Sequence, residues 1–236
     1  MWAIGAMHRA AGVENPTKAE VVRLALKRMA RAAGTRQRQA APLVDDDVRL
    51  AIRAAGPSPS RATLRNLALM LVMRDLLARR SEAVALDVAH LTFAKDGSAT
   101  VLIARSKTDQ EGQGEVRWLS PRTVTHLRSW LDSAGIAEGP VFRSVNKAGR
   151  VGGRLPAADV SRILKRVAAL AGLNAHGVSG HSCRVGMTQD LAASGTELPA
   201  IMQAGRWRSP TMPARYAERM VASRGAVPPF YEGRRE

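Results

Sequence analysis

A histidine and an arginine in the C-terminal third of the sequence are spaced to bind phosphate together. His181 and Arg184 are three residues apart, so on a helix both side chains lie on one face. The preceding Gly-Val-Ser-Gly (177–180) allows a tight approach of the chain, and a helix N-terminus at His181 adds amide donors and the positive end of a dipole. Taken alone, such a pair more often belongs to a surface helix with a solvated arginine.

Five segments of the sequence together resemble the signature of the tyrosine recombinase (phage integrase) family. They are Leu-Ala-Arg-Arg-Ser-Glu (77–82), Arg-Ser-Lys-Thr-Asp (105–109), Ser-Gly-His-Ser-Cys-Arg-Val-Gly (179–186), Ile-Met-Gln-Ala-Gly-Arg-Trp (201–207) and Tyr216. The segments follow the order of the family pattern, and Tyr216 lies nine residues after Trp207, as in that pattern. The resemblance covers nearly the whole chain and is densest from residue 178 to residue 216.

The resemblance implies a reaction in which a tyrosine attacks a DNA phosphodiester. Tyr216 would form a 3′-phosphotyrosyl bond and release a 5′-hydroxyl. A phenol holds its proton at neutral pH, and His181 is suited to remove that proton. Lys107, placed on a β-hairpin by the resemblance, would protonate the departing 5′-oxygen.

The same resemblance implies which residues stabilise the phosphate in the transition state. Arg79 and Arg184 would clamp its non-bridging oxygens, because guanidinium groups donate two hydrogen bonds at once. The indole N–H of Trp207, which can only donate, would bind one of the same oxygens. Glu82 is expected to orient Arg79 or His181 rather than to react itself.

A structural role is the alternative for several of these residues. Arg79 belongs to a basic pair, and such pairs usually form a solvated helix face. Lys107 could instead be an ordinary loop lysine. Trp207 could instead be an aromatic residue of the core, in a chain with only 4% aromatic residues. Tyr231 is the only other tyrosine and lies outside the motifs, so Tyr216 is the predicted nucleophile.

The charge balance predicts a polyanionic partner. The 236 residues include 36 Lys and Arg against 20 Asp and Glu, which gives a formal net charge of +16. Thirty of the basic residues are arginine, whose planar fork grips phosphate in two places. Nucleic acid is therefore favoured over acidic lipid, and double-stranded DNA is the expected partner, with no small-molecule substrate.

Other features of the sequence exclude several classes of site. Cys183 is the only cysteine, so no internal disulfide and no cysteine-built zinc site can form, and its predicted role is core packing. A P-loop and an acidic metal cluster are both absent from the sequence, so neither a cofactor nor a metal is expected. Apolar stretches such as 67–73 are much shorter than the roughly 20 residues that span a bilayer, and no signal peptide precedes them. The predicted location is cytoplasmic, on the nucleoid through DNA.

The elements that must position these residues are predicted to be mainly helical. Helices are expected at 17–34, 45–55, 61–86, 121–133, 156–171, 182–193, 197–204 and 210–220. Thr17 is expected to cap the first helix, with Glu20 completing a capping box. Three short strands, at 91–93, 100–105 and 115–119, are expected to form an antiparallel sheet. The predicted fold class is mainly α with a small antiparallel β-sheet (α+β).

The resemblance implies the catalytic-domain fold of the tyrosine recombinases, preceded by part of a helical core-binding domain. Residues 1–34 are predicted to be a remnant of that domain, and 35–43 a polar, basic linker. Residues 44–221 are the predicted catalytic domain, and 222–236 the C-terminal tail. Because the family's DNA clamp uses a complete first domain, weaker DNA binding and weaker tetramer formation are expected here.

The activity implied by the resemblance is that of a site-specific recombinase or integrase. A homotetramer would join two DNA sites and exchange their strands without a metal ion. Two alternatives stay open. One is a non-catalytic or defective DNA-binding relic or regulator that occupies recombination sites, and the other is a type IB topoisomerase-like enzyme that rejoins the original strand.

Overall fold

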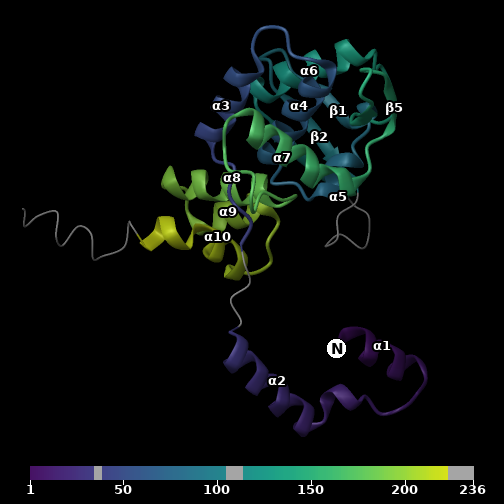
Figure 1. The fold of residues 1–236 in the computed structure, drawn as a ribbon, viewed down its shortest axis with the longest axis vertical. Coiled ribbons are helices and arrows are strands. Elements are labelled where there is room, and N and C mark those ends of the chain that lie inside the picture. Colours follow the sequence, from purple (N-terminus) through teal and green to yellow (C-terminus); the bar gives the residue numbers. More distant parts are fainter. Residues whose placement is uncertain (35–38, 105–113, 223–236) are drawn as a thin grey trace, which may run out of the picture. The chain divides into compact units, whose positions relative to one another are not determined.

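The computed structural model describes residues 1–34, 39–104 and 114–222, without the side chains of 219–222 (Figure 1). The chain divides into two compact units, Met1–Gln39 and Ala40–Glu236. The described residues contain no helix that is both apolar enough and long enough to cross a membrane.

The first unit contains α1 (Trp2–Ala10), the 3-10 turn η1 (Pro16–Lys18) and α2 (Glu20–Ala33). The predicted cap at Thr17 is wrong, because the side chain of Asn15 accepts from the Thr17 amide at 3.0 Å and caps η1 instead. Helix α2 begins at Glu20 without a side-chain cap, and α1 was not predicted because no capping residue precedes it. Gly5 is the only buried residue among those described in this unit.

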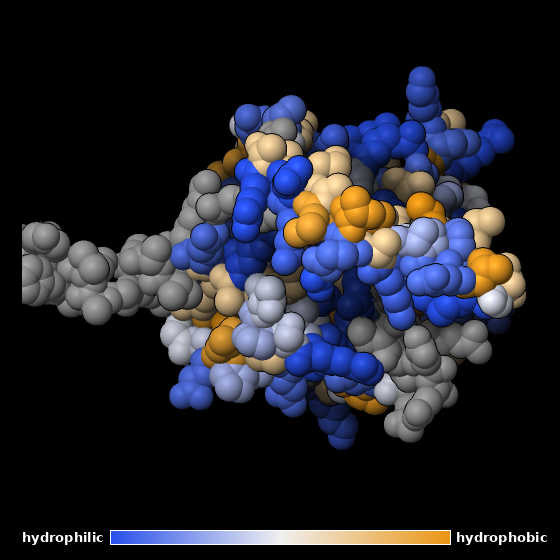
Figure 2. All heavy atoms as spheres, turned by 90° about the horizontal axis from the view of Figure 1, so that it is seen from below, coloured by the Kyte–Doolittle hydropathy of each residue, from blue (hydrophilic) through white to orange (hydrophobic). Residues whose placement is uncertain are grey.

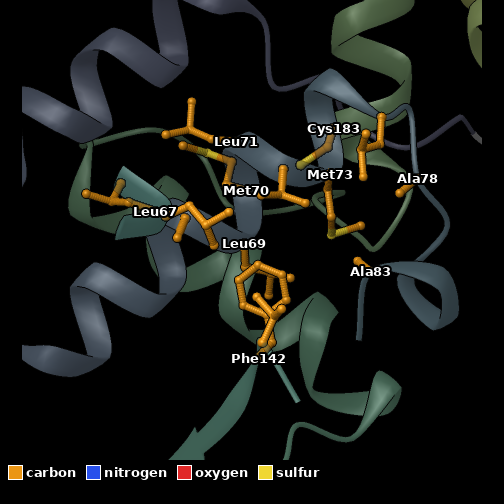
Figure 3. Packing of buried hydrophobic residues seen from close by; sticks show 14 of the residues in the cluster. Leu67, Leu69, Met70, Leu71, Met73, Ala78, Ala83, Phe142 and Cys183 are labelled. Atoms are coloured by element: carbon orange, nitrogen blue, oxygen red, sulfur yellow. The ribbon is translucent and has the colours of Figure 1, made fainter. Parts of the chain in front are cut away.

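Helix α4 (Arg61–Asp75) forms the centre of the second unit. Ser60 caps it by accepting from the Thr63 amide, and the helix is buried on all sides from Leu67 to Arg74. Four longer helices pack against it, α3 (Asp45–Ala55), α6 (Pro121–Ala134), α7 (Val160–Leu170) and α8 (Ser182–Ala193), together with one short helix described below. Figure 3 shows Leu69, Met70 and Met73 of α4 gathered with Phe142 and Cys183 in one apolar core.

The predicted single helix over 61–86 is interrupted in the structure. Helix α4 ends at Asp75, and the short helix α5 (Arg80–Val84) begins after a turn in which Leu77 has a φ of 43°. A left-handed conformation is uncommon for a residue with a β-carbon, and neither glycine nor proline marks the break. The turn directs the Leu77 carbonyl oxygen toward the Arg184 side chain, which donates to it.

The predicted three-stranded antiparallel sheet is confirmed, in the order β1 (Leu91–Phe93), β2 (Ala99–Ile103), β3 (Glu115–Leu119). Alternate residues of β2 are buried, as expected for a strand with one face on the core. A second pair, β4 (Arg143–Val145) and β5 (Val151–Arg154), was not predicted, because β5 is rich in glycine. The fold class is mainly α with small antiparallel sheets, as the sequence predicts.

Over the described residues 182–222, the second unit carries α8, α9 (Leu198–Gly205) and α10 (Thr211–Ala222). Helix α8 packs on α4, and α10 packs on both α8 and α9. Figure 2 shows one face of the molecule, on which hydrophilic side chains predominate and apolar side chains appear in small groups. Helix α8, helix α10 and the turn between α9 and α10 carry the predicted site residues Arg184, Tyr216 and Trp207.

The chain enters the second unit along helix α8. The Ala41 amide donates to the Gly177 carbonyl at 2.9 Å, and the Leu43 amide donates to the Ser182 carbonyl at 3.1 Å. The Leu43 carbonyl accepts from Arg74, and Gly186 of α8 lies so close that an added β-carbon would be 1.9 Å from that oxygen. Residues 41–43 are thus fixed against the turn before α8 and its first two turns.

Candidate active site

Arg184 is a buried cation near the N-terminal end of α8. The residue is 3% exposed, and its two terminal nitrogens donate to the carbonyl oxygens of Leu77 and Gly205. Among the described residues it forms no ion pair with a carboxylate. Burial lowers the pKa of Arg184 to about 10, and the charges of Arg79 and Arg206 act in the same direction. The guanidinium therefore stays charged at neutral pH without an acidic partner to neutralise it.

Trp207 and Tyr216 continue from Arg184 in a line of ring contacts. The Arg184 guanidinium carbon lies 4.2 Å from the centroid of the Trp207 ring, which is cation–π geometry. The rings of Trp207 and Tyr216 meet edge to face, with centroids 5.9 Å apart. Gly205 allows this packing, because a β-carbon there would lie 1.8 Å from the indole ring. The structure thus brings together the three predicted residues of α8, the α9–α10 turn and α10.

Arg79 is held by Glu82 at the start of α5. The Arg79 amide donates to Glu82 Oε2 at 2.9 Å, and its Nη1 donates to Oε1 at 2.7 Å. Burial by itself would raise the pKa of the Glu82 carboxyl, but the Arg79 amide, the charge of Arg206 and the guanidinium hydrogen bonds lower it below its ordinary value. Glu82 is therefore an ionised, buried acid that orients Arg79.

Arg206 is a member of this cluster that the sequence pattern does not indicate. Its side chain is 7% exposed, and its Nη2 donates to Glu82 Oε2 at 2.6 Å. The residue lies inside the 201–207 motif, but its inward direction depends on a left-handed backbone, with a φ of 56°. Only the structure reveals this conformation, since left-handed residues are ordinarily glycine or asparagine.

His181 lies on the exposed edge of the site as the N-cap residue of α8. Partial burial lowers its pKa, and the nearby charges of Arg184, Arg80 and Arg79 lower it further. The imidazole is consequently neutral at pH 7, which is the form that can accept a proton. Its position near two of the cluster's arginines agrees with a role beside a bound anion.

Lys107 lies outside the described residues, in the segment that joins β2 to β3. The described base of this hairpin contacts the site, because Arg117 Nη2 of β3 donates to the Gln203 carbonyl of α9 at 2.7 Å. Glu115 Oε2, also on β3, lies 3.9 Å from Arg206 Nε. Strand β3, which follows the segment that contains Lys107, therefore lies close to the arginine cluster.

The chemical capacity of the cluster is that of an anion site beside a phenol. The guanidinium groups of Arg79 and Arg206 contact one carboxylate, and the charge of Arg184 acts on the same cluster. A neutral imidazole and a tyrosine ring lie at its border. Within the described ranges, no three His, Cys, Asp or Glu side chains are grouped so as to hold a metal ion.

Comparison with known proteins gives consistent matches. The family model described as "Phage integrase family" matches residues 42–222. The chain is 33% identical over 226 residues to an integrase/recombinase xerD homolog of Selenomonas ruminantium, covering 92% of this chain and 66% of that protein. It is 26% identical to the recombinase cre of Escherichia phage P1, covering 94% of this chain and 69% of that protein. The chain thus spans about two thirds of the length of these relatives.

Solved structures with the same fold include the site-specific recombinase XerH and the recombinase XerA. XerH bound to its palindromic difH substrate superposes with a TM-score of 0.60 at 16% identity, covering 80% of this chain and 54% of that one. The XerA recombinase superposes with a TM-score of 0.59 at 18% identity, covering 89% of this chain and 76% of that one. At such identities the likeness concerns the fold alone, and it confirms the predicted catalytic-domain fold. With the family match over most of its length, the chain belongs to the phage integrase family of tyrosine recombinases.

Proposed function

We propose that this chain is a site-specific DNA recombinase that cleaves and rejoins strands through a 3′-phosphotyrosyl bond at Tyr216. Family membership supports site-specific DNA recombination as the general activity. The observation that carries the specific mechanism is the contact series Arg184, Trp207, Tyr216, in which an uncompensated buried cation lies one ring away from a phenol. This arrangement places a fixed positive charge near the phenol that would attack the phosphate.

In the cleavage step, the Tyr216 oxygen attacks the phosphorus, and the bond from phosphorus to the 5′-oxygen breaks. His181 accepts the phenolic proton, because its lowered pKa keeps it neutral. Lys107 donates a proton to the departing 5′-oxygen, so a 5′-hydroxyl and a phosphotyrosine result. Attack by a 5′-hydroxyl from another strand reverses the step and seals the exchanged strand.

The arginines stabilise the charge that develops on the phosphate oxygens. Arg184 is fixed by two carbonyl oxygens and an aromatic ring, so little rearrangement is needed when the phosphate binds. Arg79 is fixed by Glu82 through its amide and its side chain, and is 24% exposed, which leaves it accessible to a ligand. The Trp207 N–H is proposed as a further donor to the same oxygens.

The proposed partner is double-stranded DNA, bound by a homotetramer that joins two sites. The net charge of +16 supports DNA binding, and the Tn1549 transposon integrase, a structural neighbour at 12% identity, was solved in complex with a circular intermediate DNA. In this proposal residues 44–221 form the catalytic domain, while 1–34, 35–43 and 222–236 are the domain remnant, linker and tail.

The test is an SDS-resistant adduct assay on a supercoiled plasmid that carries the DNA flanking the chain's own gene. The wild-type chain is expected to form a covalent protein–DNA adduct, and Tyr216→Phe none, while both bind the plasmid equally at low salt. Tyr231→Phe is the matched control, since Tyr231 is the only other tyrosine. It is expected to form the adduct at the wild-type rate.

Three results would change the proposal. An adduct with Tyr216→Phe would exclude Tyr216 as the nucleophile. DNA binding without any wild-type adduct would favour a defective DNA-binding relic. Relaxed plasmid without exchanged strands, on a substrate with two sites, would favour topoisomerase-like rejoining.

A further inference from the structure

Arg206 has a backbone conformation in which glycine would be the least strained residue. It is the C-cap of α9, with φ 56° and ψ 45°, immediately after Gly205. A β-carbon disfavours this left-handed region, and many helices place a glycine there. The chain nevertheless carries a long cationic side chain at this point and buries it.

The burial of Arg206 is not explained by good hydrogen bonding. Its Nη2 is satisfied by Glu82, but Nε and Nη1 are buried and have no hydrogen-bond partner among the described residues. The 3.9 Å between Nε and Glu115 Oε2 is too long for a hydrogen bond. Unpaired buried donors cost stability, so the position is not optimised for folding.

The charges around Glu82 indicate what Arg206 contributes. Glu82 is the carboxylate that both Arg79 and Arg206 contact, and Arg184 has no acidic partner among the described residues. These four groups carry three positive charges and one negative charge, a net charge of +2. Without Arg206 the net charge would fall to +1, and the charge of Glu82 would be balanced by Arg79 alone.

We propose that Arg206 is a positioning residue that neutralises Glu82, so that Glu82 can orient Arg79 without cancelling the charge that Arg79 offers to the phosphate. This inference rests on the proposed function, because it assigns Arg206 to the same phosphate site. It differs from a direct phosphate contact by Arg206, since its effect depends on the presence of the Glu82 charge.

The test is a double-mutant cycle with Arg206→Gly and Glu82→Gln, measured as the rate of adduct formation on the plasmid described above. Glycine removes the side chain and fits the left-handed backbone, so the variant separates charge from strain. Arg206→Gly is expected to slow adduct formation by about ten- to a hundred-fold, the effect of one hydrogen bond between charged groups. In the Glu82→Gln background the same change is expected to alter the rate by no more than about twofold.

Each alternative result has a definite meaning. An equal loss in both backgrounds would show that Arg206 acts on the phosphate itself, and no loss in either would show that it has no role; both overturn the proposal. Arg206→Lys keeps the charge and is expected to recover most of the rate. Arg53→Ala, at an exposed arginine of α3, is the control for losing one positive charge, and DNA affinity should fall no more in Arg206→Gly than in this control.

A second readout separates this inference from the proposed function. The Glu82 carboxyl can be titrated by carbon-detected NMR in the full chain. Because the Arg206 charge helps to lower the pKa of Glu82, that pKa is expected to rise in Arg206→Gly and to stay unchanged in Arg53→Ala. If the wild type forms no adduct, the proposed function fails. An unchanged Glu82 titration in Arg206→Gly would overturn the pairing of Arg206 with Glu82 itself.

Discussion

Two buried arginines on neighbouring helices show how differently a protein can hold the same side chain. Arg74, in the last turn of α4, is 2% exposed and pairs with Asp190 of α8 at 2.5 Å. It also donates to the Leu43 carbonyl and lies 3.7 Å from the Met187 sulfur. Arg184 is 3% exposed, but its partners are two backbone carbonyls and the face of Trp207.

The difference lies in whether the positive charge is neutralised. A carboxylate at hydrogen-bond distance cancels the charge of Arg74, which then joins α4, α8 and the entering chain as a structural contact. Carbonyl oxygens and an aromatic ring orient Arg184 without cancelling its charge. A buried arginine of the second kind is costly for folding and suited to an anionic ligand, so the partners of an arginine are more informative than its burial.

The largest effect is expected at the uncompensated arginine. Arg184→Lys keeps a positive charge, but an ammonium cannot hold the two carbonyls and stack on Trp207 in the same geometry. Adduct formation is expected to fall by about a thousandfold, as when a preorganised transition-state donor is removed, with DNA binding retained. The rate of single-turnover cleavage measures this effect. A fall in that rate of less than about tenfold would mean that a positive charge at position 184 is sufficient for cleavage, whatever its geometry.

A smaller effect, on a different quantity, is expected at the neutralised arginine. Arg74→Met removes the donor to the Leu43 carbonyl and leaves the Asp190 carboxylate with the Asp45 amide but no cation, so the free energy of unfolding should fall by about 2–4 kcal/mol. Cleavage per folded molecule should stay within about twofold of the wild type. Urea unfolding measures the first quantity, and Arg74→Met combined with Asp190→Asn should cost less than the sum of the single changes. Full additivity would contradict the pairing.

The smallest effects are expected at two glycines, one beside each arginine site. A β-carbon at Gly186 would meet the Leu43 carbonyl, which is backbone, whereas one at Gly205 would meet the Trp207 ring, which can move. Both alanine variants are expected to lose about 1–3 kcal/mol of stability, with Gly186→Ala the more destabilised. Gly205→Ala alone should also slow cleavage, because Trp207 leaves Arg184. If Gly186→Ala and Gly205→Ala cleave at the same rate per folded molecule, the Arg184 site and the Arg74 site do not differ in their importance for cleavage.

The sequence predicts the regular elements better than the turns between them. Strands β1 and β3 have the predicted bounds, and α8 begins and ends at the predicted residues. The break at Leu77 was not predictable, because leucine rarely adopts a left-handed backbone conformation and no glycine or proline marks the turn. This turn also determines where the Leu77 carbonyl points, and therefore how Arg184 is held.

The sequence predicted which residues belong to the candidate site, but not which of their side chains contact one another. Motif spacing indicates Arg79, Glu82, Arg184 and Trp207, and the structure brings these side chains into contact in two groups. Their roles remain predictions until the adduct assay. Arg206 escaped prediction because its contribution depends on one backbone angle and one distant carboxylate, which no local pattern encodes.

The hydrogen bonds that fix residues 41–43 have a mechanical consequence. Any tension on the chain ahead of Ala41 loads the Ala41–Gly177 hydrogen bond first and then the Leu43–Ser182 hydrogen bond, at the residue whose side chain joins the apolar core. Gly177 and Ser182 lie on either side of His181 in the sequence. A force applied at the entry of the second unit is therefore delivered to the turn that carries the proposed proton acceptor.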